Sequence, residues 1–147
     1  MNSKLWFALT LVALPLCADD IKIKRSDLPA AVQQALGQVS QGATIVGYSK
    51  EIENGKTLYE IEMKTGKVTK DVTLDESGKV VVVEQEVSLD SVPAAVKEGL
   101  TKGAGKARIT KVESITEGSK VTYEAQLNGG KTKELVVDTD GNVVPSK

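Results

Sequence analysis

An internal repeat limits what this 147-residue chain can fold into. The segment Pro29-Ala30-Ala31-Val32 recurs as Pro93-Ala94-Ala95-Val96, at an offset of 64 residues. A repeat of this length indicates the duplication of one supersecondary unit, which alone buries too little surface to be comfortably stable. The same offset, reduced to 63 after one turn, matches Leu36 with Leu100, Tyr59-Glu60 with Tyr123-Glu124, Thr69-Lys70 with Thr132-Lys133, and Gly78 with Gly141. We therefore predict two tandem units, residues 19–83 and 84–147.

Each unit begins with a helix. In the first unit, Leu28, Val32 and Leu36 recur at helical spacing and form one apolar stripe. The second unit repeats the stripe, but Gly99 and Gly103 lie in it, and glycine weakens a helix interior. The second helix is therefore predicted to be shorter or frayed.

Strands follow the helix in each unit. In the first unit the predicted strands are Ala43–Ile52, Lys56–Met63 and Val68–Leu74, joined by turns at Asn54-Gly55 and Thr65-Gly66. The predicted fold class is α+β, with two tandem units, each a helix packed on one face of a 3–4-stranded antiparallel sheet whose other face meets solvent. The expected core residues are Val32, Leu36, Ile61, Val72 and Leu74, matched by Val96, Leu100, Ala125, Leu135 and Val137.

The run Val80–Val83 marks the predicted joint between the units. It lies in a long predicted strand, Lys79–Val87, and Ile21-Lys22-Ile23 is the expected counterpart of that strand ahead of the first unit. Four consecutive valines predict burial on both faces of the strand. The two units are therefore expected to share a sheet or an interface here.

The N-terminal segment has the features of a secretory signal peptide. Lys4 precedes the apolar run Leu5–Leu14, and Pro15 then leads to Ala18 and two acidic residues. The run is too short for a permanent transmembrane helix, which takes roughly 20 residues. We predict a signal peptide over residues 1–18, cleavage after Ala18, a periplasmic or secreted protein, and no stable membrane insertion afterwards. Lipidation at Cys17 is the alternative.

Composition excludes several classes of function. A net charge of −1 provides no basic field for a nucleic-acid backbone, and 3% aromatic residues provide few platforms for base stacking. Cleavage after Ala18 would remove the single Cys of a chain that has no His. The mature protein would then lack the His base of nucleophilic catalysis and the usual ligands of zinc. We predict no nucleic-acid partner.

Two groups of carboxylates could carry chemistry, and both have a simpler interpretation. Asp138-Thr139-Asp140-Gly141-Asn142 resembles part of a calcium loop but lacks the distal Glu, so a glycine-containing turn is favoured. Glu60 and Glu62 are placed on an outward strand face, where solvated cross-strand charge pairs are favoured over acid–base catalysis. We predict no catalytic, cofactor-binding or metal-binding residues, and hence no enzyme.

The repeated pattern of Leu-Pro-Ala-Ala-Val, a helix, Tyr-Glu and Asp-x-x-Gly resembles the PepSY-like domain. It is most similar to the exported bacterial family that resembles the β-lactamase inhibitor protein. The resemblance covers both units and depends on Pro29/Pro93, Tyr59/Tyr123 and Gly78/Gly141. It implies tandem units with a curved open sheet surface, an exported protein, and a role in binding or inhibiting other proteins. It implies no catalytic residues.

The sequence and the resemblance together favour an exported, non-catalytic binding module, and inhibition of a secreted or periplasmic protein or peptide is the more specific form of this prediction. The alternative is a passive envelope or stress-related protein without a tight partner. We expect a monomer whose partner is an exported protein or peptide. The predicted partner-binding face consists of Leu58, Glu60, Glu62, Asp71, Thr122, Glu124, Gln126 and Glu134.

Overall fold

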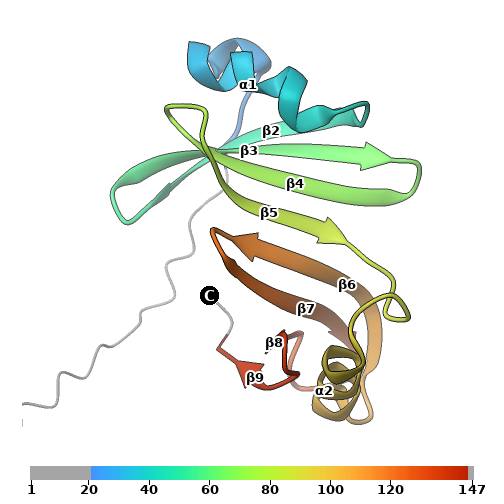
Figure 1. Cartoon of the computed structure of the whole chain (residues 1–147). Coiled ribbons are helices and arrows are strands. Elements are labelled where there is room, and N and C mark those ends of the chain that lie inside the picture. Colours follow the sequence, from blue (N-terminus) through green and yellow to red (C-terminus); the bar gives the residue numbers. More distant parts are fainter. Residues whose placement is uncertain (1–20, 146–147) are drawn as a thin grey trace, which may run out of the picture.

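The computed structural model describes residues 21–145, which form an antiparallel sheet with two α-helices (Figure 1). The predicted signal peptide, its cleavage site and Cys17 lie outside the described residues. The helices are α1 (Ala30–Ser40) and α2 (Ala94–Ala104), and a short 3-10 helix, η1 (Arg25–Asp27), precedes α1. The strands are β1 (Ile21–Lys22), β2 (Thr44–Glu53), β3 (Lys56–Thr65), β4 (Val68–Asp75), β5 (Val80–Glu86), β6 (Arg108–Glu117), β7 (Lys120–Asn128), β8 (Glu134–Asp138) and β9 (Val143–Val144). Within residues 21–145, no helix is long and apolar enough to cross a membrane.

All nine strands belong to one sheet, in which chain neighbours are also sheet neighbours. The α+β class is therefore confirmed, but the prediction of a 3–4-stranded sheet in each unit is wrong. The two units become continuous through β5, which pairs with β4 on one side and with β6 on the other. Pairing both edges of β5 satisfies backbone groups that would otherwise lie at two open sheet edges. The predicted boundary between residues 83 and 84 thus falls inside a strand that both units use.

The two helices lie on the same face of the sheet, one towards each end (Figure 1). Val72 pairs with Val83 and Val83 with Thr116, and directly paired residues point to the same side, so the face under α1 continues across β5 to β6. Val32 and Leu36 of α1 pack on a cluster from β3 and β4, and Val96 and Leu100 of α2 pack on the equivalent cluster from β6, β7 and β8. All ten predicted core residues are buried.

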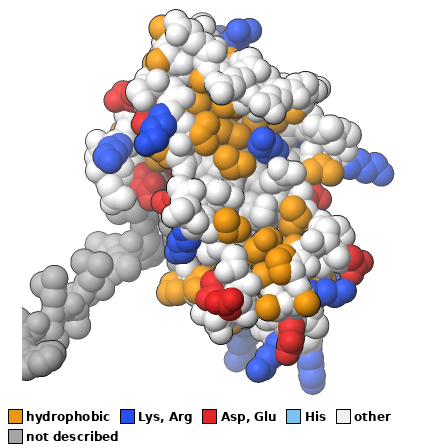
Figure 2. Space-filling model, viewed as in Figure 1, with side chains coloured by type: hydrophobic (Ala, Val, Ile, Leu, Met, Phe, Trp, Pro, Cys, Tyr) orange, Lys and Arg blue, Asp and Glu red, His pale blue; other side chains and the backbone are white. Residues whose placement is uncertain are grey.

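The valine run of β5 is not buried on both faces, which corrects the prediction for Val80–Val83. Val80 is 40% exposed and Val81–Val83 are half-buried. The physical reason is that each helix covers one end of the sheet and leaves β5 between them. A groove of about 380 Å³ remains beside α1, lined by Ala35 and Val39 of the helix and by Val80 and Val83 of β5, among others. Hydrophobic side chains gather below α1 in the same region of Figure 2.

Helix α2 is as long as α1, with 11 residues each, so the prediction of a shorter or frayed helix is wrong. The glycines of α2 serve close packing instead. A Cβ on Gly99 would lie 2.1 Å from the Gly141 carbonyl oxygen, and one on Gly103 would lie 2.5 Å from Leu135 Cδ2. The equivalent residues of α1 are Ala35 and Val39, which line the groove. The second helix therefore contacts its sheet more closely than the first.

Strand β1 is the counterpart of the end of β5, as predicted. Lys22 pairs with Ser49 of β2, and 64 residues later Glu86 pairs with Glu113 of β6. The backbone of the two units is therefore equivalent at this position although the side chains differ. In the first unit this strand is β1, at the edge of the sheet. In the second unit it is β5, which also pairs with β4 of the first unit.

Candidate functional site

The face of the sheet opposite the helices, which we call the open face, carries all eight residues of the predicted binding face. Glu62 pairs with Asp71, and Gln126 pairs with Glu134. Alternate residues along β3 and β7 add the other members to the same side. The eight residues form two groups of four, one in each unit, and β5 and β6 lie between the groups.

Two members of the predicted face are poorly accessible. Leu58 is 8% exposed and Thr122 is 9% exposed, whereas the sequence predicts both as outward contacts. Leu58 is flanked in the sheet by Glu51 and Asp75, whose longer or equally long side chains limit its access to water. Thr122 lies between Ile115 and Asp138. Both residues therefore occupy largely buried positions on the open face, which corrects their prediction as outward contacts.

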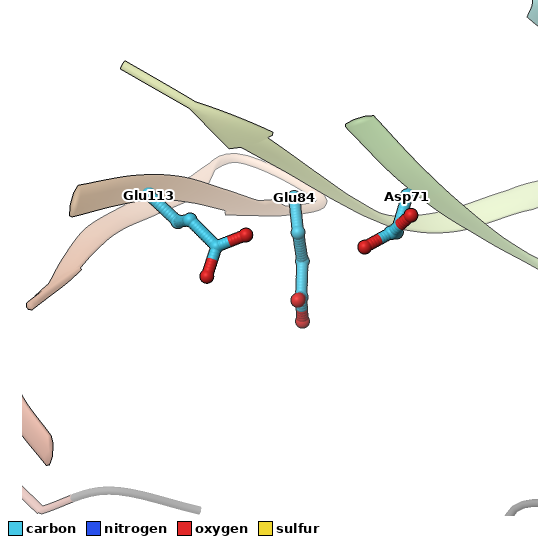
Figure 3. Close-up of side chains that lie close together, drawn as sticks. All are labelled: Asp71, Glu84 and Glu113. Atoms are coloured by element: carbon cyan, nitrogen blue, oxygen red, sulfur yellow. The ribbon is translucent and has the colours of Figure 1, made fainter. Parts of the chain in front are cut away.

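The centre of the open face holds a cluster of acidic side chains, of which the sequence predicted Asp71 as part of the binding face and missed Glu84 and Glu113. Asp71 of β4, Glu84 of β5 and Glu113 of β6 extend from neighbouring strands to the same side of the sheet (Figure 3). Each residue has a carboxylate oxygen within 4.8 Å of an oxygen of the other two. Glu113 is also directly opposite Glu86 and Glu124 on its two neighbouring strands. We call Asp71, Glu84, Glu86, Glu113 and Glu124 the seam carboxylates, because they surround the joint of β5 and β6.

Lys111 lies among the seam carboxylates. Its Nζ is 2.6 Å from Glu113 Oε1, and the Glu113 side chain is largely buried. Burial lowers the pKa of Lys111, but its hydrogen bond to Glu113 and the charges of Glu113, Glu86 and Asp71 together outweigh burial and raise that pKa. Glu86 has a different partner, since its Oε2 accepts hydrogen bonds from the backbone N–H and the hydroxyl of Thr69, at 3.2 and 3.1 Å.

Three of the acidic groups hold their protons more tightly than carboxylates in water do. Burial, and then the charges of Glu62 and Glu113, raise the pKa of Asp71. Burial, and then the charges of Glu113 and Asp71, raise the pKa of Glu84. The pKa of Glu124 is raised to about 7, again by burial first and then by neighbouring carboxylates, of which Glu134 acts most strongly.

This arrangement attracts cations. Asp71, Glu84 and Glu113 can each offer one oxygen to a metal ion, and a lysine or arginine side chain could meet the same oxygens. The sequence did contain a signal for the cluster: Glu84 and Glu86 alternate at the end of the valine strand, and Glu113 alternates with Lys111 in β6. To predict that these residues lie together, one must know the register in which β5 pairs with β6, and neither strand specifies that register alone.

The Asp138–Asn142 segment is the turn that the sequence favoured. Asp138 Oδ1 accepts hydrogen bonds from the backbone N–H groups of Asp140 and Asn142, at 3.0 and 2.9 Å. These bonds, together with the Asn142 side chain, lower the pKa of Asp138. Asp75 closes the equivalent turn of the first unit by accepting bonds from Ser77 and Lys79. The carboxylate of each turn therefore accepts hydrogen bonds from the backbone of its own turn and stabilises that turn.

Comparison with known proteins identifies the pattern in both units. A family described as "Putative beta-lactamase-inhibitor-like, PepSY-like" matches residues 17–82 and again residues 67–144. No curated protein matches the sequence.

Solved structures with the same fold come from Bacteroides species. A BLIP-like protein from Bacteroides fragilis is 19% identical, with a TM-score of 0.62 over 81% of this chain and 85% of its own. A DUF2874 family protein from Bacteroides ovatus is 18% identical, with a TM-score of 0.63 over 80% and 85%. A protein from Bacteroides eggerthii, described among "putative periplasmic proteins", is 17% identical, with a TM-score of 0.67 over 80% and 86%. At these identities the similarity establishes the fold.

Proposed function

We propose that this chain, which belongs to the PepSY-like family, is an exported, non-catalytic module that binds a basic protein or peptide through its open face. The observation that carries the proposal is the row of seam carboxylates across the joint of the two units. Export is supported by the signal-peptide pattern and by the description of a structural relative as periplasmic.

The charge of the open face indicates the chemistry of the partner. Acidic groups that approach one another attract a positive surface, accelerate its association, and make binding weaken with added salt. The described part of the face contains no Trp or Phe, because Trp6 and Phe7 lie in the predicted leader. Large aromatic anchors supply much of the energy of the tightest interfaces, so we expect an affinity of roughly micromolar rather than picomolar strength.

Inhibition of the partner is the more specific form of this proposal. Its support is the description of the family as β-lactamase-inhibitor-like and the BLIP-like structural relative. The alternative is a passive envelope protein, for which we expect an open face of mixed and well-hydrated charges. Around β5 and β6 the charges are mostly of one sign and are half-buried, which favours a binding function.

The test compares two charge reversals of equal size. One variant combines Glu60→Lys and Glu124→Lys, which occupy equivalent places on the open face of the two units. The control combines Glu76→Lys and Glu98→Lys, which are exposed in the β4–β5 turn and on α2. Both variants change the net charge equally. A difference in partner binding between them therefore shows that the position of the charge on the surface matters, and not the net charge.

We expect the wild type and the control to capture the same basic proteins from periplasmic extract, and the open-face variant to lose them. Urea unfolding of all three proteins checks that the variants remain folded, since Glu124 is half-buried. Retention of every wild-type partner by the folded open-face variant would place the binding site elsewhere. The hairpin loops at Asn54-Gly55 and Gly118-Ser119 would then be tested next.

A further inference from the structure

The two units provide an internal comparison at the seam. Glu86 and Glu113 face each other across β5 and β6, whereas Lys22 and Ser49 face each other across β1 and β2. Both pairs occupy the same place in the repeat, 64 residues apart. Since the same backbone accepts a lysine opposite a serine, the fold itself does not require carboxylates at the seam.

The carboxylates of the seam oppose the stability of the sheet when all of them are charged. Like charges directly opposite each other on neighbouring strands are destabilising, and Glu113 has such a neighbour on each side. Glu113 is only 7% exposed, so water screens it poorly. Protonation of one carboxylate near Glu113, such as Glu84 or Glu124, relieves the repulsion that its neighbours feel.

The surroundings of the seam supply little compensation. Lys111 is the cation in contact with Glu113, and Lys22 is paired with Glu62 at the edge of the face. Charged groups around the seam carboxylates on the open face include Glu60, Glu62 and Lys64 of β3, Lys111 of β6 and Glu134 of β8, and farther along the same face Lys22 of β1 and Glu51 of β2. Most of these charges are negative and add to the repulsion.

We propose that the seam is a proton-operated switch, in which mild acid protonates Asp71, Glu84 and Glu124, strengthens the joint of the two units, and reduces the negative charge of the open face. The raised pKa values of Asp71, Glu84 and Glu124 agree with this direction. A carboxyl group whose pKa is raised by folding binds more protons in the folded state than in the unfolded state. Stability therefore rises as the pH falls from about 7, the raised value of Glu124, towards the ordinary carboxyl value of about 4.5.

The effect on binding rests on the proposed function. A basic partner is attracted by ionised carboxylates, and each proton taken up by the face removes one of these charges. Partner binding should therefore be tight near neutral pH and weaker in mild acid. The effect on stability needs no partner and can be tested separately.

The first experiment measures urea unfolding of the purified protein between about pH 8 and pH 5, in the presence of EDTA. We expect the wild-type midpoint to move to higher urea as the pH falls. Glu84→Gln and Glu124→Gln should each raise the midpoint at pH 8 and reduce its pH dependence, because an amide keeps the shape and removes the charge. Glu98→Gln, on the exposed side of α2, should leave both quantities unchanged. Lys111→Met should lower the midpoint at pH 8, since it removes the cation at Glu113.

A wild-type midpoint that is constant or falls towards pH 5 would overturn the switch. So would seam variants that keep the full wild-type pH dependence. Stabilisation at pH 8 by millimolar calcium, as large as that by acid, would assign the cluster to a metal ion instead of protons.

The second experiment measures binding of an octalysine peptide at constant ionic strength and at the same pH values. We expect binding at pH 8 that weakens several-fold by pH 5 in the wild type and less in Glu84→Gln. Binding of equal strength at both pH values would overturn the regulatory half of the proposal and leave the proposed function standing. No binding at any pH would count against the proposed function, and the unfolding result would still decide whether the seam is a switch.

Discussion

Two glycine-to-alanine substitutions at the helices should change stability in opposite directions. Gly37 lies in α1, and a Cβ there would have no atom within 4 Å. Gly99 lies in α2, and a Cβ there would be 2.1 Å from the carbonyl oxygen of Gly141 and 2.8 Å from its carbonyl carbon. The added methyl group is the same in both variants, so the difference between them reports the packing of the helix on the turn.

The magnitude follows from two terms. Alanine in place of glycine in a helix interior stabilises by about 0.5–1 kcal/mol, and this term applies to both sites. At Gly99 the helix or the turn must also move by about 1 Å to restore a normal contact, and overpacking of this kind costs typically 1–3 kcal/mol. We therefore expect Gly37→Ala to be stabilising by about 0.5–1 kcal/mol and Gly99→Ala to be destabilising by about 1–2 kcal/mol.

The turn has little freedom to move away from an alanine at position 99. Gly141 has a φ of 82°, and a Cβ on Gly141 would itself lie 2.2 Å from the carbonyl oxygen of Ala95. The contact between α2 and this turn is thus backbone against backbone, which cannot yield by a change of rotamer. The first unit has the same contact between Gly78 and Ala31.

Urea unfolding followed by circular dichroism would measure both variants, with an unchanged m-value as evidence that the same two-state transition is compared. The reasoning would be refuted by a Gly99→Ala protein as stable as the wild type. Equal destabilisation by the two substitutions would refute it too, because it would indicate that helix propensity and close approach are not the deciding terms.

Further predictions follow from the core, the turns and the leader. Leu36→Ala and Leu100→Ala should each cost about 2–5 kcal/mol, and a loss below about 1 kcal/mol at both sites in urea unfolding would contradict their place in the core. The pKa values of Asp75 and Asp138 are lowered by their turn hydrogen bonds, so the stability that these groups add should be lost as the pH falls below about 4, which a pH series of unfolding midpoints would detect. Intact-mass measurement of the exported protein should give a chain that begins directly after Ala18, and a lipid-modified mass would contradict this cleavage.

The local structure was predictable because each signal lies within one element. The spacing of Val32 and Leu36 specifies the inner side of α1, and Asn54-Gly55, with φ values of 50° and 76°, forms the predicted tight hairpin turn. The repeat then transferred each assignment to the second unit. For this reason the ten predicted core residues were correct in both copies.

The features that escaped prediction depend on contacts between elements. Helix propensity alone predicts that a glycine destabilises the helix that contains it. Gly99 is nevertheless required, because the turn at Gly141 approaches α2 too closely for a larger residue. The run of valines in β5 predicts burial on both faces of the strand, but the exposure of these valines depends on how far the two helices extend over the sheet. A sequence pattern reports the preferences of a segment and does not report the distance to its neighbours.

The seam carboxylates show what the duplication added beyond a second copy. A side chain at position 22 lies on a short outer strand, where a lysine is easily hydrated and pairs with Glu62. The equivalent side chain at position 86 lies on a strand with a neighbour on each side, so its surroundings include groups from both units. A carboxylate in that setting interacts with Glu113 and its neighbours instead of with water alone. The joint is thus a chemical environment that a single unit lacks, and this is the physical reason to seek both the partner and the response to pH there.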